Sequence, residues 1–162
     1  MKSRIVNGDV LKATESVIAH QTNCKGIMGA GVAKQIKSKY PEVFQGYLDF
    51  CMSNGYNGEY LLGQAQFVSS RDGKQFVNLF GQDGISEKDL NEAKHGRITN
   101  YEAFADALAR LHTAMNNRGL KSVAMPYLIG CGLAKGNWNV VAAMIDAEFD
   151  NSDIDVVLYK FC

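Results

Sequence analysis

Two glycine-rich segments, far apart in the chain, carry the clearest chemical signal in the sequence. Residues 28–34 read Met-Gly-Ala-Gly-Val-Ala-Lys, and residues 129–135 read Ile-Gly-Cys-Gly-Leu-Ala-Lys. Each follows a short apolar run typical of a strand and precedes a stretch typical of a helix. Because glycine has no Cβ, its backbone N–H can approach a phosphate closely, and the first N–H groups of a helix favour anions. The two segments predict two sides of one anion site, with a diphosphate as the expected ligand.

The two segments differ from the common phosphate-binding fingerprints. Residues 29–34 lack the third glycine of the dinucleotide fingerprint, and neither segment contains the Gly-Lys-Ser/Thr of a Walker loop. The alternative to a ligand site is that the glycines only allow a helix to pack tightly on a strand. One Gly-x-Gly would carry little weight, but two in the same strand-to-helix setting favour a ligand site.

Polar residues that follow apolar runs are the next candidates. Asp9 either accepts hydrogen bonds from a base amine or caps a short helix that begins at Leu11. His20 has an intrinsic pKa suited to acid–base catalysis, although it ends an apolar strand and can equally point into the core. Asp83 and His95, in the long polar stretch 81–96, are weaker candidates that would have to swing over the site.

Composition excludes several classes of function. The 162 residues fit one domain, and the formal net charge is zero, which argues against strong nucleic-acid binding. The four cysteines are widely spaced and the three histidines form no His-x-x-x-His pair, so we expect no metal site and no cofactor. The sequence shows neither a signal peptide nor a membrane-spanning run, and we expect a cytoplasmic protein with no membrane partner.

Hydrophobic periodicity alternates strands with helices along the chain. We expect strands at 5–6, 17–21, 64–69, 75–80, 121–125 and 154–161, the third and fourth joined by a hairpin turn at 71–74. We expect helices at 32–40, from Pro41 to about 54, from a capping box at 99–102 to Gly119, and after Asn137. Residues 58–63 are expected to form turns and 81–96 a surface loop. The pattern predicts one α/β domain over residues 1–162, a three-layer α/β/α fold with a mixed central sheet.

Several motifs taken together resemble the macro domain, an ADP-ribose-binding module, over nearly the whole chain. They are Asn-Gly-Asp-Val at 7–10, His-Gln-Thr-Asn at 20–23, Gly-Ile-Met-Gly-Ala-Gly-Val-Ala at 26–33, and Pro-Tyr-Leu-Ile-Gly-Cys-Gly-Leu at 126–133. Their variants resemble the branch with the yeast-type ADP-ribose 1''-phosphate phosphatase and the terminal ADP-ribose glycohydrolase. The stretch 76–82 is similar to bacterial and phage members of that branch.

The resemblance implies a role for each motif. Asp9 and the Val10 backbone would bind adenine, Asn23 would face the distal ribose, and Tyr159 would border the adenine face. The first glycine segment would line the diphosphate and distal ribose through Gly26, Met28, Gly29, Ala30, Gly31 and Val32. The second would wrap the phosphates from the other side through Gly130, Cys131, Gly132, Leu133 and Ala134. His20 and Asn23 are the candidates for catalytic roles.

One departure bears on the activity. The glycohydrolase of this branch has a catalytic aspartate where this chain has Ala134, and a catalytic lysine for which residues 78–82 offer none. The leading hypothesis is a hydrolase that converts ADP-ribose 1''-phosphate to ADP-ribose, or removes ADP-ribose from modified macromolecules. The alternative is a non-catalytic reader of ADP-ribose. A module that acts on modified nucleic acid is a third hypothesis, which zero net charge disfavours.

Overall fold

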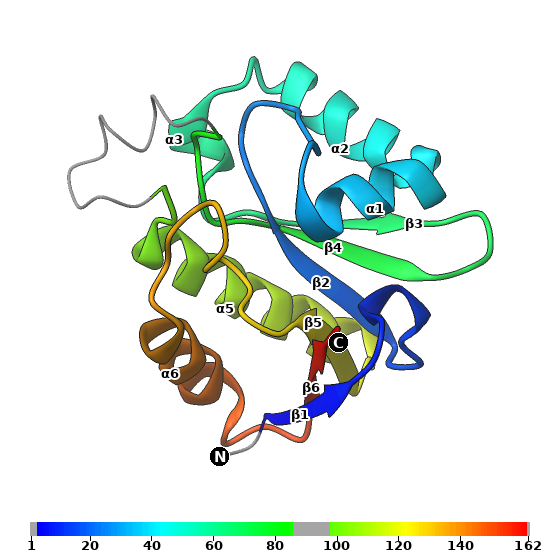
Figure 1. Ribbon diagram of the computed structural model, residues 1–162, viewed down its shortest axis with the longest axis vertical. Helices are drawn as coiled ribbons and strands as arrows, with labels where there is room; N and C mark the ends of the chain where they lie inside the picture. Colours follow the sequence, from blue (N-terminus) through cyan, green and yellow to red (C-terminus); the bar gives the residue numbers. More distant parts are fainter. Residues whose placement is uncertain (1–2, 86–97, 162) are drawn as a thin grey trace.

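A six-stranded sheet forms the centre of the molecule. The computed structural model of the chain describes residues 3–85 and 98–161, and its strands lie in the order β1-β6-β5-β2-β4-β3 (Figure 1). They are β1 (Arg4–Asn7), β2 (Val17–Thr22), β3 (Ala65–Ser69), β4 (Gln75–Phe80), β5 (Ser122–Pro126) and β6 (Asp155–Lys160). All neighbours pair in parallel except β3 and β4, which form the predicted antiparallel hairpin. The mixed sheet is confirmed.

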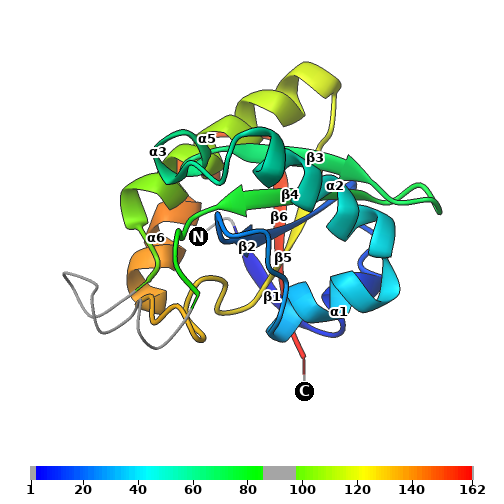
Figure 2. The same cartoon turned by 90° about the horizontal axis from the view of Figure 1, so that it is seen from above.

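Helices cover both faces of this sheet (Figure 2). The helical elements are η1 (Val10–Lys12), α1 (Gly31–Lys39), α2 (Pro41–Ser53), α3 (Gly58–Leu61), α5 (Tyr101–Arg118) and α6 (Trp138–Phe149). On one face the strands pack with Ile36 of α1 and Tyr47 of α2. On the other face they pack with Leu108 of α5 and Ile145 of α6. These two apolar cores confirm the three-layer α/β/α architecture.

The helix boundaries follow local capping chemistry. Pro41 opens α2 directly after α1 ends, as predicted, because proline fits the first turn of a helix. Asn137 caps α6 by accepting from the N–H of Asn139. Residues 58–63, expected to be turns, begin with one helical turn because Asn57 accepts from the N–H of Glu59.

The predicted capping box at 99–102 is wrong by one residue. Asn100 caps α5, since its side chain accepts from the N–H of Ala103, and Gly119 ends the helix in the left-handed conformation. The hydroxyl of Thr99 instead contacts Gly130 O, far along the chain. The surface loop predicted for 81–96 lies mostly in residues 86–97, outside the described part of the chain.

The parallel strands place two loops at the same edge of the sheet. The first loop, residues 23–30, follows β2, and the second loop, residues 127–136, follows β5, which pairs with β2. Ligands of open α/β sheets bind beyond the carboxyl ends of such strands. None of the helices within the described ranges is long and apolar enough to span a membrane.

Candidate functional site

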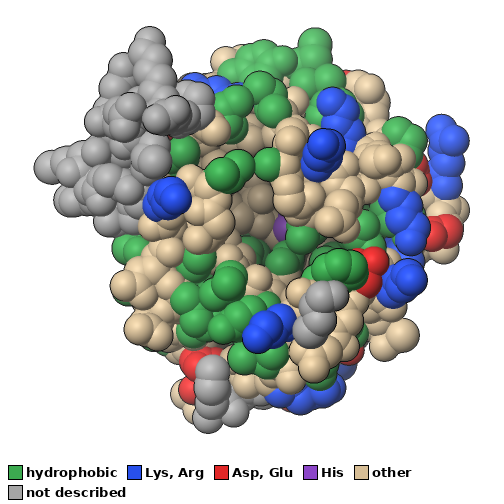
Figure 3. All heavy atoms as spheres, viewed as in Figure 1, with side chains coloured by type: hydrophobic (Ala, Val, Ile, Leu, Met, Phe, Trp, Pro, Cys, Tyr) green, Lys and Arg blue, Asp and Glu red, His purple; other side chains and the backbone are tan. Residues whose placement is uncertain are grey.

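A cavity of about 590 Å³ opens between the two loops. Figure 3 shows a hollow near the centre of this face, bordered mainly by hydrophobic and uncharged side chains. The volume falls in the usual range of about 300–1,000 Å³ for small-molecule sites. The lining residues are His20, Gln21, Thr22, Asn23, Ile27, Gly29, Ala30, Gly31, Val32, Ala33, Gln82, Ile85, Pro126, Tyr127, Leu128, Ile129, Gly130, Cys131, Gly132, Leu133 and Ala134.

The start of α1 forms one wall of the cavity. Ala30 is its N-cap residue and offers no side-chain acceptor. Within the described residues, the N–H groups of Gly31, Val32 and Ala33 donate to no protein acceptor. Gly31 has φ +56°, which glycine adopts without strain. This wall therefore presents free donors together with the positive end of the α1 dipole.

The second loop forms the opposite wall. The N–H groups of Gly132, Leu133 and Ala134 also find no acceptor among the residues that the structure describes. Gly130 has φ +75°, and its carbonyl accepts a hydrogen bond from Gly136 N, in the same loop, at 2.9 Å. A Cβ on Gly136 would lie 2.4 Å from that oxygen, so this close approach requires glycine. The second wall is therefore a turn with free N–H groups, an arrangement of the kind that can bind an anion.

The cavity wall carries no formal charge in its described part. None of its lining residues there is Asp, Glu, Lys or Arg. The attraction for an anion therefore comes from the backbone donors on the two walls and from the α1 dipole. No three His, Cys, Asp or Glu side chains in residues 3–85 and 98–161 could hold a metal ion together.

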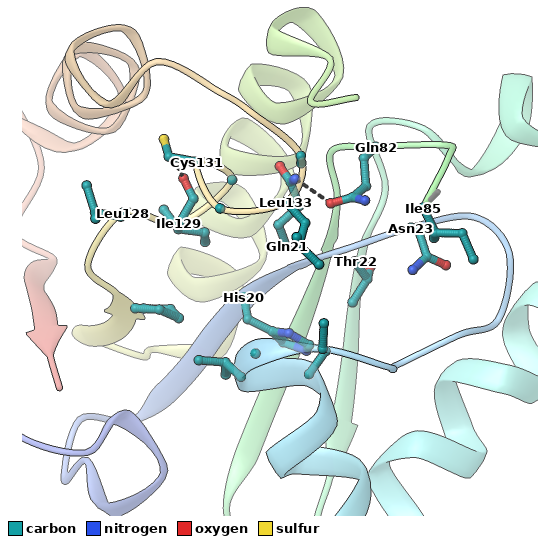
Figure 4. A pocket seen from close by; sticks show the side chains of 18 of the residues that line it. His20, Gln21, Thr22, Asn23, Gln82, Ile85, Leu128, Ile129, Cys131 and Leu133 are labelled. Carbon is teal, nitrogen blue, oxygen red and sulfur yellow. Dashed lines mark hydrogen bonds between the residues drawn. The ribbon is translucent and has the colours of Figure 1, made fainter. Parts of the chain in front are cut away.

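His20 lies at the floor of the cavity, next to the start of α1 (Figure 4). Asn78 donates its Nδ2 to Gln66 Oε1 at 3.0 Å, which leaves Asn78 Oδ1 to accept from His20 Nε2 at 2.7 Å. The proton of the neutral ring is thus on Nε2, and the lone pair is on Nδ1. Burial lowers the pKa of His20 to about 4, although the hydrogen bond to Asn78 opposes this shift. The ordinary pKa that made His20 a candidate general base is therefore lost in the fold.

The Asn23 side chain mainly holds the first loop in place. Its Oδ1 accepts from Lys25 N at 2.9 Å and from the Tyr47 hydroxyl at 2.7 Å. Its Nδ2 donates to Ile27 O at 2.7 Å. One N–H of the amide remains for a ligand, so the sugar contact implied by the family resemblance is reduced to a single donor.

Two predicted ligand residues of the first loop, Gly26 and Met28, lie outside the cavity lining and pack against other side chains. Met28 is 1% exposed and packs in the core beneath α1 and α2, so its side chain is not on the cavity wall. A Cβ on Gly26 would lie 2.9 Å from the Leu48 side chain and 3.0 Å from that of Tyr56. This close packing accounts for the glycine at position 26, and the contact of Gly26 and Met28 with a ligand stays a prediction.

The predicted adenine-binding residues lie outside the cavity lining. Asp9 caps η1 by accepting from Leu11 N at 2.9 Å, which is the alternative that its residue type favoured. Val10 is buried in the core. The Tyr159 hydroxyl donates to Glu15 Oε1 at 2.6 Å. Their contact with a base stays a prediction.

The other candidate groups that the structure describes form no acid–base pair at the cavity. Asp83 forms an ion pair with Lys25 at 3.3 Å, and His95 lies outside the described residues. Ala134 is on the second wall, where the related glycohydrolases were expected to have a carboxylate. Burial raises the pKa of the Cys131 thiol, which makes it a poor nucleophile at neutral pH.

Sequence reasoning missed several polar residues of the cavity. Gln21, Thr22 and Gln82 line it, and Gln21 Nε2 donates to Gln82 Oε1 at 2.7 Å (Figure 4). These residues stand inside stretches that the sequence already singled out, at 20–23 and 76–82. The signal that would have assigned them was the pairing of β2 with β4, which brings the ends of both stretches together.

The fold and the site define a class of protein before any comparison is made. A three-layer α/β/α domain with two opposed sets of backbone donors at its carboxyl edge is typical of domains that bind phosphate-containing ligands. The chain matches the Macro domain family over residues 19–145 and belongs to that family.

Relatives and solved structures agree with this assignment. A protein of Mycobacterium tuberculosis named DNA ADP-ribosyl glycohydrolase is 32% identical over 94% of this chain, and the match covers 40% of the relative. A protein of Meyerozyma guilliermondii named ADP-ribose 1''-phosphate phosphatase is 26% identical over 89% of this chain and 92% of its own length. The macrodomain of Mycobacterium tuberculosis DarG has a TM-score of 0.78 at 26% identity, with 97% of each chain covered.

Proposed function

We propose that the chain binds ADP-ribose with the diphosphate between its two loops and hydrolyses ADP-ribose 1''-phosphate to ADP-ribose. Removal of ADP-ribose from modified macromolecules is the related activity that the same site would serve. The observation that carries the proposal is the opposed pair of donor sets, at Gly31–Ala33 on one wall and Gly132–Ala134 on the other. The family and the activities named for the relatives support it.

The proposed binding mode uses the whole carboxyl edge of the sheet. The diphosphate lies between the donor sets, and the distal ribose reaches toward the remaining N–H of Asn23. The adenine extends toward Asp9, Val10 and Tyr159, at the ends of β1 and β6. No charged side chain among the described lining residues neutralises the phosphates, so affinity depends on the geometry of the backbone donors.

Hydrolysis in this site relies on electrostatic stabilisation and positioning. Phosphoryl transfer develops charge on the oxygens of the 1''-phosphate, and N–H groups of the two loops that the diphosphate leaves unoccupied would stabilise this charge. In our proposal the substrate's own diphosphate positions the attacking water, because His20 is neutral and its conjugate acid has a pKa of about 4. The neutral Nδ1 of His20 can accept a hydrogen bond from a ribose hydroxyl or from that water.

The second candidate function is a non-catalytic reader of ADP-ribose. The observation that favours it is the described cavity wall itself, which offers donors for binding but no carboxylate, lysine or histidine of near-neutral pKa. In this case the same residues would bind ADP-ribose on a modified macromolecule without turnover. Either function would suit a cytoplasmic protein, which stays part of the proposal.

Calorimetry combined with phosphate release separates the two functions. The protein is first titrated with ADP-ribose and then mixed with ADP-ribose 1''-phosphate while inorganic phosphate is measured. Binding of the first and phosphate release from the second support the phosphatase. Binding of both without release supports the reader or a hydrolase of macromolecule-linked ADP-ribose. Absence of binding to either would refute the proposed site.

A further inference from the structure

We infer that Thr99 is a positioning residue for the ligand site, because its hydroxyl and backbone hold the second loop at both ends of its donor set. The inference rests on the proposed function and deepens it. Thr99 lies just before α5, is 2% exposed, and is outside the residues that line the cavity. It therefore acts on a ligand through the groups that it holds in place and not as a lining residue.

The Thr99 side chain controls the start of the donor set. Its Oγ1 donates to Gly130 O at 2.6 Å and accepts from Gln21 Nε2 at 3.0 Å. A hydroxyl has one proton, so donation to Gly130 requires that the contact with Gln21 runs in the opposite direction. Together with the bond from Gly136 N, this contact occupies the Gly130 carbonyl, whose partial negative charge would otherwise be free to repel a phosphate.

The backbone of the same segment controls the end of the donor set. Ile98 N and Thr99 N both donate to Ala134 O, at 2.8 and 3.1 Å. The free N–H groups of residues 132–134 thus lie between two anchors made by one short segment. Because Gln21 also donates to Gln82 Oε1, the ends of β2 and β4 are tied to these anchors (Figure 4).

The chemical consequence is a pre-organised set of donors. Backbone N–H groups stabilise an anion fully only when they already point toward it, since reorientation on binding costs free energy. Without the Thr99 hydroxyl, Gly130 O would keep only the bond from Gly136 N, and the loop would sample more peptide orientations. Binding of a diphosphate would weaken even though no residue that touches the ligand had changed.

Thr99→Val tests the inference, because valine keeps the shape of threonine and removes the hydroxyl. We expect the Kd for ADP-ribose to rise about tenfold, as for the loss of one orienting hydrogen bond. Thr99→Ser keeps the hydroxyl and should restore the Kd to nearly the wild-type value. Leu111→Val, in the buried core under α5, is the matched control for loss of stability and should leave the Kd unchanged.

Amide hydrogen exchange of the free protein gives a second, ligand-independent readout. In Thr99→Val we expect faster exchange at the hydrogen-bonded amides of Cys131, Lys135 and Gly136, and unchanged exchange in the central strands. A wild-type Kd in Thr99→Val, or an equal loss in Leu111→Val, would overturn the inference. If the wild-type protein does not bind ADP-ribose, the proposed function fails, and the exchange rates still decide whether Thr99 positions the loop.

Discussion

The buried imidazole of His20 makes the stability of this fold depend on pH in a measurable way. Burial lowers its pKa from 6.5 to about 4. In the unfolded chain the ring regains an ordinary pKa of about 6.5. Between these two values the unfolded chain binds a proton that the folded chain does not, so stability falls as the pH falls.

The size of the effect follows from the two pKa values. Each unit of difference corresponds to about 1.4 kcal/mol. For a single group with these values, the free energy of unfolding decreases by about 2 kcal/mol between pH 7 and pH 5, and by about 3 kcal/mol at pH 4. Since small domains are stable by only about 5–15 kcal/mol, a loss of this size is readily detected.

The assay compares urea unfolding of the wild-type protein with that of His20→Gln at pH 7, 6 and 5. Glutamine does not titrate and can still donate to Asn78 Oδ1. Other titrating groups contribute equally to both proteins, so they cancel in the difference. Relative to His20→Gln, the free energy of unfolding of the wild-type protein should fall by about 2 kcal/mol from pH 7 to pH 5. Parallel pH profiles would refute the assignment of a buried, neutral His20.

Substitutions at three glycines test the two walls. Gly31→Glu should abolish ADP-ribose binding in a folded protein, measured by calorimetry, at a strain cost of about 1–2 kcal/mol for φ +56°. Gly132 has open space around its Cβ position. Gly132→Ala should therefore bind ADP-ribose nearly as the wild type does, whereas the charged side chain of Gly132→Glu should abolish binding. Equal affinities of the two variants would contradict a role of the second wall in binding the diphosphate. In Gly136→Ala the new Cβ would lie 2.4 Å from Gly130 O, so we expect the second loop to shift and ADP-ribose binding to weaken. An unchanged Kd would show that the loop accommodates the alanine.

Local patterns predicted the elements of this fold well because their causes are local. Pro41 marks the junction of α1 and α2, Asn137 caps α6 and Gly119 ends α5, each through chemistry within a few residues. One exception is Thr99, whose sequence context matched a capping box. Its hydroxyl bonds to Gly130 O instead, a partner that no local pattern reveals.

The walls of the site could be predicted, but the use of individual side chains could not. The strand-to-helix setting of the glycines correctly placed Gly31 and Gly132 on the cavity, because parallel strands end at one edge. Gly26 carries the same local signal, yet its Cβ space is filled by Leu48 and Tyr56 from a later part of the chain. The pKa of His20 depends on burial, which only the assembled fold determines.

The central claim is that free backbone N–H groups on two opposed walls bind a diphosphate. The most direct test is an amide-resolved NMR titration of the ¹⁵N-labelled protein with ADP-ribose. We predict the largest shifts at the amides of residues 31–33 and 132–134, which find no acceptor in residues 3–85 and 98–161. Saturable binding with shifts confined to other parts of the chain, or with only one of the two walls affected, would contradict the claim.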